Sequence, residues 1–284
     1  MDTQYNTKCY YFDKKEYNSG FLDKSVDATY IIHLENNGRI DHINEQLSKF
    51  QPTKTVYITR NQGFKKCTKR LIEQVSYQDL TDAFLQCFQH ANTHGYDNIL
   101  ILEDDFIFSD EITKSENIDI VNTFLIKNKE NAFIYYFGCN PILIVPYDWN
   151  HYYSFESLSA HAIVYSRKTR QLPLNTELKH WDVIIKNSDT SKYLYYKPLC
   201  YQTYPETENK KTWSEKDNAF IFEAKKWIIQ TLNLDKTPEP GFSIIYMLAK
   251  LLFLLFILFT AFKIWFSYKY IIKYMKVSNY KSKK

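Results

Sequence analysis

Short apolar runs alternate with amphipathic segments along the first two thirds of the chain. Apolar runs bounded by polar or turn residues predict strands at residues 27–34, 55–59, 98–102, 132–137, 160–166 and 193–196. Segments with helical spacing or helix-forming composition predict helices at residues 39–49, 76–94, 112–131, 168–172 and 215–232. This alternation predicts an α/β fold with a mostly parallel central sheet.

The helix predicted at residues 76–94 has the clearest pattern. Its apolar residues recur at helical spacing and form one stripe: Leu80, Ala83, Phe84, Cys87, Phe88 and Ala91. Ser76 and Asp79 match a variant capping box, and Gly95 fits a C-terminal cap. The helix leads directly into the apolar run at 98–102, as expected for a helix that connects to a parallel strand.

The apolar run at 98–102 ends abruptly in Glu103, Asp104 and Asp105. If strand alternation continues through the motif, Glu103 and Asp105 point to one side and Asp104 to the other. Ligands of open α/β sheets bind at the carboxyl ends of strands, and paired carboxylates suit a hard divalent cation. A solvated acidic turn is the alternative interpretation of the same residues.

Residues 242–262 are almost wholly apolar and are interrupted only by Lys250. Their length matches a bilayer core, which predicts either a single membrane span or an interfacial helix. The resulting organisation is an N-terminal extension (1–26), a main domain (27–235), a linker (236–241), the apolar segment (242–262) and a basic tail (263–284). The tail lysines have no acidic neighbours: Lys263, Lys269, Lys273, Lys276, Lys281, Lys283 and Lys284.

Charge and cysteine usage limit the possible partners and compartments. The net charge of +4 is modest and lies largely in the tail, so the main domain lacks the clustered basic face of a nucleic-acid-binding protein. The five cysteines contain no CxxC pair, which disfavours zinc and predicts free thiols in a reducing compartment.

The orientation of the chain on a membrane stays open at this point. The N-terminus lacks an apolar signal core, which, together with free thiols, favours a main domain on the cytosolic face. The basic tail favours a cytosolic C-terminus by the positive-inside bias. Both conditions hold for an interfacial segment, but not for a single span.

Six spaced sequence pieces together resemble glycosyltransferase family 25, which includes lipooligosaccharide sugar transferases and collagen galactosyltransferases. The pieces are YIIHLENNGR (30–39), the helix at 76–94, ILILEDD (99–105), SAHAIVYSRKT (159–169), HWD (180–182) and KPLCYQ (197–202). The resemblance covers about residues 28–202, and LILEDD is its most specific part. His33 stands where the family usually has Asn, and residues 106–159 do not align with the family pattern.

The resemblance implies a GT-A fold and an inverting transfer of a hexose from a UDP-sugar to a glycan or protein acceptor, with Mn²⁺ or Mg²⁺ as cofactor. By resemblance, Asp105 ligates the metal, and Glu103 faces the metal or the ribose of the nucleotide. Asp104 is expected to cap a loop or to ligate through water. Arg39 and Gln202 are expected to contact the nucleotide, although Arg39 also fits a surface position at a helix start.

Inversion also requires a general base that deprotonates the acceptor hydroxyl, and Asp182 is the candidate. His161 and His180 are candidates for a further metal ligand. Two other classes of function remain open: a catalytically inactive sugar-binding or membrane scaffold protein, and a metal-dependent phosphoryl-transfer enzyme. The sequence lacks the glycine-rich phosphate loops, which disfavours the last of these.

Overall fold

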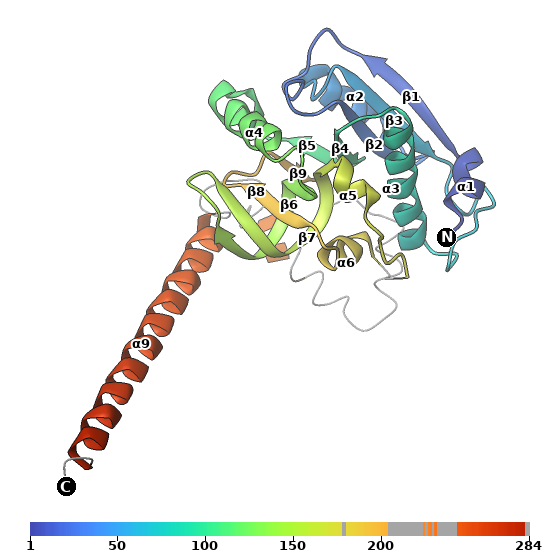
Figure 1. Ribbon diagram of the computed structural model, residues 1–284. Helices are drawn as coiled ribbons and strands as arrows, with labels where there is room; N and C mark the ends of the chain where they lie inside the picture. Colours follow the sequence, from blue (N-terminus) through green and yellow to red (C-terminus); the bar gives the residue numbers. More distant parts are fainter. Residues whose placement is uncertain (178–179, 204–223, 225–226, 229, 232–242, 282–284) are drawn as a thin grey trace.

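The computed structural model describes residues 1–177, 180–203, 224, 227–228, 230–231 and 243–281 (Figure 1). The predicted linker at 236–241 and most of the predicted helix at 215–232 lie outside the described residues. The described part consists of an α/β domain built around a seven-stranded sheet, followed by a long C-terminal helix.

Three parallel strands form one half of the sheet: β2 (Ala28–Leu34), β3 (Thr55–Asn61) and β4 (Asn98–Glu103). The crossover helices α2 (Ile40–Lys49) and α3 (Ser76–Thr93) cover opposite faces. Ile31 of β2 is buried in one core with α2, whereas Tyr30 is buried in the other core with α3. Burial on both faces explains why these strands are continuous apolar runs.

The expectation of a mostly parallel sheet is wrong, because most strand pairings are antiparallel. The strand order is β1-β3-β2-β4-β7-β6-β8, completed by β1 (Tyr10–Glu16), β6 (Phe133–Pro146), β7 (His151–Ser166) and β8 (Ser191–Tyr195). β7 runs antiparallel to β4, β6 and β8, and β1 runs antiparallel to β3. The physical reason is that β6 and β7 join in a long hairpin, which needs no crossover helix.

Smaller elements complete the domain. β5 (Phe106–Phe108) and β9 (Cys200–Gln202) pair as a second, two-stranded sheet. The predicted helix at 112–131 forms as a 3-10 turn, η2 (Asp110–Thr113), followed by α4 (Ser115–Lys127), which packs on the same face as α2. On the opposite face, α5 (Arg167–Gln171) and α6 (Trp181–Lys186) lie near α3, where the rings of Trp181 and Phe84 stack with centroids 4.4 Å apart.

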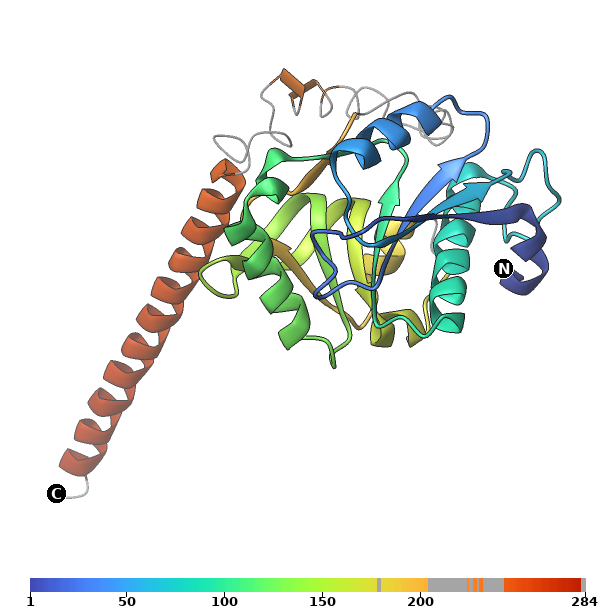
Figure 2. The same ribbon diagram turned by 90° about the horizontal axis from the view of Figure 1, so that it is seen from above.

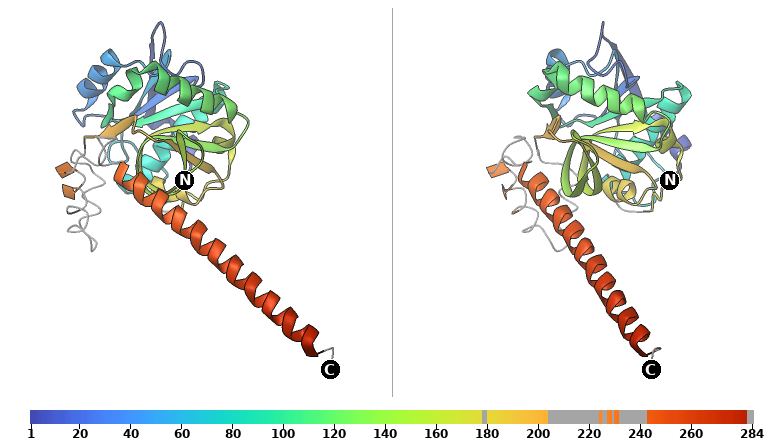
Figure 3. Two further views of the ribbon diagram at one scale, coloured as in Figure 1. Left: turned by 90° about the vertical axis from the view of Figure 1, so that its left-hand side faces the viewer. Right: turned by 60° about the vertical axis from the view of Figure 1, so that its left-hand side comes forward.

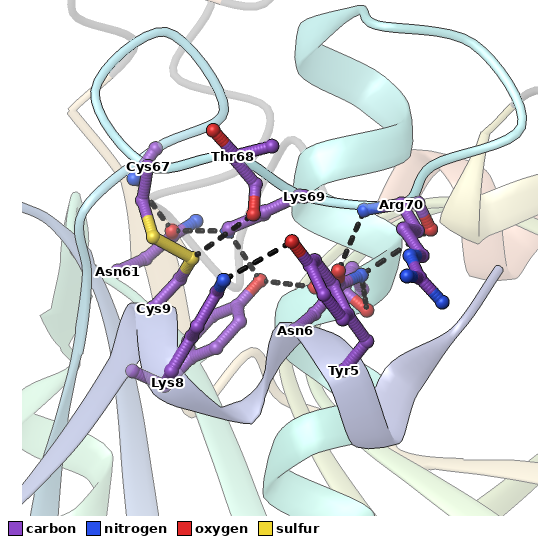
Figure 4. Close-up of a disulfide and its surroundings, with 12 residues drawn as sticks. Tyr5, Asn6, Lys8, Cys9, Asn61, Cys67, Thr68, Lys69 and Arg70 are labelled. Atoms are coloured by element: carbon purple, nitrogen blue, oxygen red, sulfur yellow. Dashed lines mark hydrogen bonds between the residues drawn. A yellow bond between two sulfur atoms is a disulfide. The ribbon is translucent and has the colours of Figure 1, made fainter.

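The N-terminal segment is part of the main sheet and is covalently tied to it. α1 (Thr3–Asn6) and η1 (Thr7–Cys9) lead into β1, so the sheet begins before residue 27. Cys9 forms a disulfide with Cys67 in the loop that follows β3 (Figure 4). The free-thiol expectation is therefore wrong for this pair, whereas Cys87, Cys139 and Cys200 are free.

A buried lysine lies beside the disulfide (Figure 4). The Lys69 ammonium donates to the Asp79 carboxylate at 2.5 Å and to the side-chain oxygens of Tyr10 and Asn61 at 2.6 Å each. Burial lowers the pKa of Lys69, and the neighbouring Asp79 opposes that shift. Because Asp79 is engaged here, the predicted capping box with Ser76 does not form; α3 has Val75 at its N-cap position without a side-chain cap.

Reduction of the disulfide is expected to destabilise the domain substantially. The bond joins residues 58 positions apart, so the loop-entropy model assigns it roughly 4 kcal/mol of the free energy of unfolding. The Cys67→Ser variant should therefore unfold at a lower temperature than the wild type and should no longer respond to reductant. Thermal unfolding with and without dithiothreitol tests this, with Cys139→Ser as the control because Cys139 is free. Equal unfolding temperatures for wild type and Cys67→Ser would contradict the pairing.

The C-terminal apolar segment is a single helix, α9 (Ser243–Lys281), that projects away from the domain (Figures 1 and 3). Its portion from Met247 to Ile272 is long and apolar enough to cross a membrane, and only 6% of the most apolar stretch of this portion is buried. The helix is longer than the predicted apolar segment and includes most of the basic tail. Its exposed apolar surface distinguishes it from the core helix of a soluble domain.

Candidate functional site

The acidic motif lies at a reversal in the order of the parallel strands. From β2 the chain crosses to β3 on one side, and from β3 it crosses back to β4 on the other side of β2. Ile32 of β2 is in register with Glu103 of β4, so the carboxyl ends of these strands are adjacent. Open α/β sheets bind ligands at such a reversal, in the crevice outside the carboxyl ends of the strands.

Asp104 holds the loop that follows β2. Its carboxylate accepts hydrogen bonds from His33 Nδ1 and the Leu34 amide at 3.3 Å, and from Asn37 Nδ2 and an Arg39 guanidinium nitrogen at 2.5 Å. Burial alone would raise the pKa of Asp104, but His33, Arg39 and Asn37 outweigh it and the net shift is downward. Asp104 is therefore a buried, ionised anchor for Arg39.

Glu103 and Asp105 are the two acids of the motif whose pKa values are raised. β4 ends at Glu103, so regular strand alternation does not extend to Asp104 and Asp105, which lie in a turn. Burial and the nearby Asp104 charge raise the pKa of Asp105 to about 6. Burial, followed by the charges of Asp105 and Asp182, raises the pKa of Glu103. Among the described residues, Oδ1 of Asp105 has no hydrogen-bond partner, although Asp105 as a residue is only 6% exposed.

Asp182, the candidate base, comes from the first turn of α6 and is brought close to this cluster. Its charge is one of the main causes of the raised pKa of Glu103. Its carboxylate accepts a 2.8 Å hydrogen bond from the amide of Ser159, a β7 residue with a positive φ of 65°. Asp182 and Glu103 are about eighty residues apart in sequence, yet the charge of one affects the pKa of the other.

The two-stranded β5–β9 sheet forms the other boundary of the acidic turn. Gln202 of β9 pairs with Phe106 of β5, the residue directly after Asp105. A hydrogen bond from the Gln202 side chain lowers the pKa of Asp105, in opposition to burial. The amide of Thr203 donates to the Asp105 carbonyl at 3.1 Å. Gln202 thus contacts a member of the acidic motif; its expected contact with a nucleotide stays a prediction.

The two histidines occupy packed positions. His161 on β7 is buried, its Nε2 lies 3.5 Å from the carbonyl oxygen of Cys200, and burial lowers its pKa to about 4. Its other nitrogen, Nδ1, has no partner in the described structure. His180 lies before α6, with its ring centroid 4.9 Å from that of Tyr77 on α3. Within the described part of the chain, no three His, Cys, Asp or Glu side chains are grouped so that they could hold a metal ion.

Sequence reasoning missed the role of His33 and Asn37 as partners of Asp104. The sequence signal was Asn36-Asn37-Gly38, a combination that is typical of a tight turn. In the structure Asn36 and Gly38 adopt left-handed conformations with φ of 62° and 77°. Such a turn returns its side chains toward the end of the strand that precedes it. The sequence could not show that Asp104 is the partner of these side chains, because Asp104 follows β4, about seventy residues away.

No protein-family model matches this chain, and no curated protein matches it significantly. The fold and the site define an α/β domain with an acidic motif at the strand-order reversal and an apolar C-terminal helix.

Proposed function

We propose that this protein is a membrane-attached, metal-dependent inverting glycosyltransferase with a GT-A-like domain that transfers a hexose from a UDP-sugar to a glycan or protein acceptor. The observation that carries the proposal is the cluster of Glu103 and Asp105 beside Asp182. Both members of the pair have raised pKa values, and Asp105 presents a buried oxygen that has no hydrogen-bond partner in the part of the chain that the structure describes. The motif resemblance supplies the class of reaction.

The donor set fits a divalent cation that is shared with a nucleotide. A cation would relieve the repulsion that raises the pKa of Glu103 and Asp105. Mg²⁺ is typically held by one or two carboxylates together with substrate phosphates, so a site with fewer than three protein ligands is compatible with this use. Asp105 and Glu103 would hold the metal, and it would supply Lewis-acid neutralisation of the departing diphosphate.

In the proposed reaction, Asp182 accepts the proton of the acceptor hydroxyl. The Ser159 amide fixes the orientation of its carboxylate, and α6 holds it near Glu103. Asp104 does not contact the reacting groups; it positions Arg39 at the carboxyl end of β2, where a guanidinium can bind phosphate oxygens. His161 and His180 stay candidates for a further metal ligand in this proposal.

A catalytically inactive sugar-binding or scaffold protein is the second candidate. The absence of a preformed three-ligand group among the described residues favours it, because binding without turnover needs no complete metal centre. The two functions predict different outcomes in the same experiment.

The decisive experiment measures UDP release from a panel of UDP-sugars by the full chain in detergent, with and without Mn²⁺. The proposed enzyme releases UDP from one donor only when metal is present, and Asp105→Asn loses that activity. Asp110→Asn is the matched control, since Asp110 is exposed and lies outside the cluster. Donor binding without release would favour the inactive alternative, and no metal-dependent release from any donor would refute the enzyme.

We also propose that α9 spans the membrane with the domain on the oxidising side. The Cys9–Cys67 disulfide removes part of the free-thiol argument for a cytosolic domain, because disulfides persist mainly in oxidising compartments. The lysine-rich tail then faces the cytosol, as the positive-inside bias requires. Protease added to sealed vesicles of cytosolic-side-out orientation should remove a C-terminal tag and spare the domain. Digestion of the domain under the same conditions would overturn this orientation.

A further inference from the structure

Exposed apolar side chains gather on the hairpin formed by β6 and β7. Among the described residues up to 203, eight large apolar side chains are exposed, namely Tyr11, Ile72, Ile126, Ile142, Leu143, Tyr147, Trp149 and Phe155, and the last five lie on this hairpin. Trp149, in the turn between the strands, is 98% exposed. Isolated exposed apolar residues are common on soluble proteins, but a concentration of this kind marks an interaction surface.

The same hairpin holds the beginning of α9. Ala249 of α9 is buried in one apolar cluster with Ile144 of β6 and Tyr152 of β7. The ammonium of Lys250 lies 5.8 Å from the centre of the Tyr152 ring. Figures 1 and 2 show the yellow-green turn between β6 and β7 beside the first turns of the orange helix. The hairpin is thus adjacent to the point where the apolar surface of α9 becomes exposed.

We propose that the β6–β7 hairpin docks into the headgroup region of the same bilayer that α9 enters. Trp and Tyr are the residues enriched at membrane–water interfaces, because an apolar ring and a polar group suit that boundary. Asp148 is the only carboxylate between residues 141 and 155, and its oxygens accept hydrogen bonds from the amides of Asn150 and His151. These hydrogen bonds hold the turn in place, and Trp149 next to Asp148 points into solvent.

A lipid surface is the occupant that continuity with α9 favours. The packed contact around Ala249 fixes the hairpin at the domain end of the candidate span, Met247–Ile272. If α9 crosses a bilayer, the lipid headgroups lie beside the hairpin. This inference rests on the proposed membrane attachment, but it is independent of whether the acidic cluster catalyses a reaction.

Docking would also orient the candidate site relative to the membrane. β7 carries the exposed Phe155 near its start and, a few residues later, Ser159, whose amide binds Asp182. A hairpin held at the bilayer surface would therefore fix the distance between the lipid and the candidate base.

The test uses the full chain reconstituted in phosphatidylcholine vesicles that contain lipids brominated near the headgroup end of the acyl chain. Bromine quenches only tryptophans that reach the membrane. We expect that the Trp149→Phe variant loses a bromolipid-quenched component of the wild-type fluorescence. Trp265→Phe serves as the reference for a tryptophan within α9, and Trp181, which is buried in the domain core, remains unquenched. Trp149 should in addition be shielded from aqueous iodide in vesicles.

Two results would overturn the docking while leaving membrane attachment intact. If carbonate extraction leaves the protein in the vesicles and the Trp149 component is quenched by iodide but not by bromolipid, the hairpin stands free in water. If Trp149 is shielded from both quenchers, another protein surface, such as a second copy of this chain, covers it. Release of the chain by carbonate would overturn the attachment itself, and the docking with it. UDP release by the same samples reports separately on the proposed enzyme.

Discussion

Replacing Asp105 by Asn should stabilise the metal-free domain at neutral and alkaline pH while abolishing its response to Mn²⁺. The pKa of Asp105 is raised from 3.8 to about 6 in the folded domain, by burial and by the Asp104 charge. Between these values the folded state binds more protons than the unfolded state, so stability falls as the pH rises through this window. Above it the ionised carboxylate costs on the order of 3 kcal/mol, which Asn removes.

Thermal unfolding of the full chain in detergent, from about pH 5 to about pH 8 with and without Mn²⁺, measures both effects. Metal ions compete with protons for carboxylates, so the stabilisation by Mn²⁺ should grow as the pH passes through about 6. Asp110→Asn, at an exposed position, should behave as the wild type does. Equal Mn²⁺ responses in wild type and Asp105→Asn would exclude Asp105 as a ligand.

The parallel strands and the helix α3 were predicted well, because their apolar pattern, their length and their turn residues all indicate the same elements. β2, β3 and β4 are apolar on both faces because helices cover both, and α3 carries one clear stripe. The β6–β7 hairpin was not predicted beyond its two ends. Pro141 and Pro146 disfavour a strand, and Ile142 and Leu143 are exposed where alternation would bury one of them. If the hairpin docks on lipid, the exposed apolar residues that break the strand pattern are also the residues that contact the membrane.

The sequence predicted which acids lie at the candidate site, but not which residues they contact. Three acids after an apolar run indicated a strand-end site, and the structure places them at the strand-order reversal. The different roles of the acids depend on tertiary neighbours. His33 and Arg39 donate hydrogen bonds to Asp104, whereas Asp105 has an oxygen without a partner among the described residues. The Cys9–Cys67 pairing is likewise a property of the folded sheet, since no sequence spacing indicates it.

Asp182→Asn should abolish sugar transfer while leaving donor binding intact. Asn retains a side-chain oxygen that can accept the hydrogen bond from the Ser159 amide, so the local structure of α6 is preserved. Loss of a general base typically lowers the rate by about 10²–10⁴-fold. Because the Asp182 charge raises the pKa of Glu103, its removal lowers that pKa and should not weaken metal binding. A loss of transfer at unchanged or tighter Mn²⁺ and donor affinity would therefore identify a role in proton transfer rather than in binding.

The measurement compares transfer to an acceptor with donor binding, each at saturating Mn²⁺, once the donor screen has identified the sugar. Asp189→Asn is the matched control, because Asp189 is an exposed aspartate that follows the end of the same helix, α6. If Asp182→Asn keeps transfer within a few-fold of the wild type, Asp182 is a structural acceptor for the Ser159 amide and the base lies elsewhere. If it loses transfer and donor binding together, Asp182 belongs to the binding cluster with Glu103 and Asp105, and inversion must use another proton acceptor.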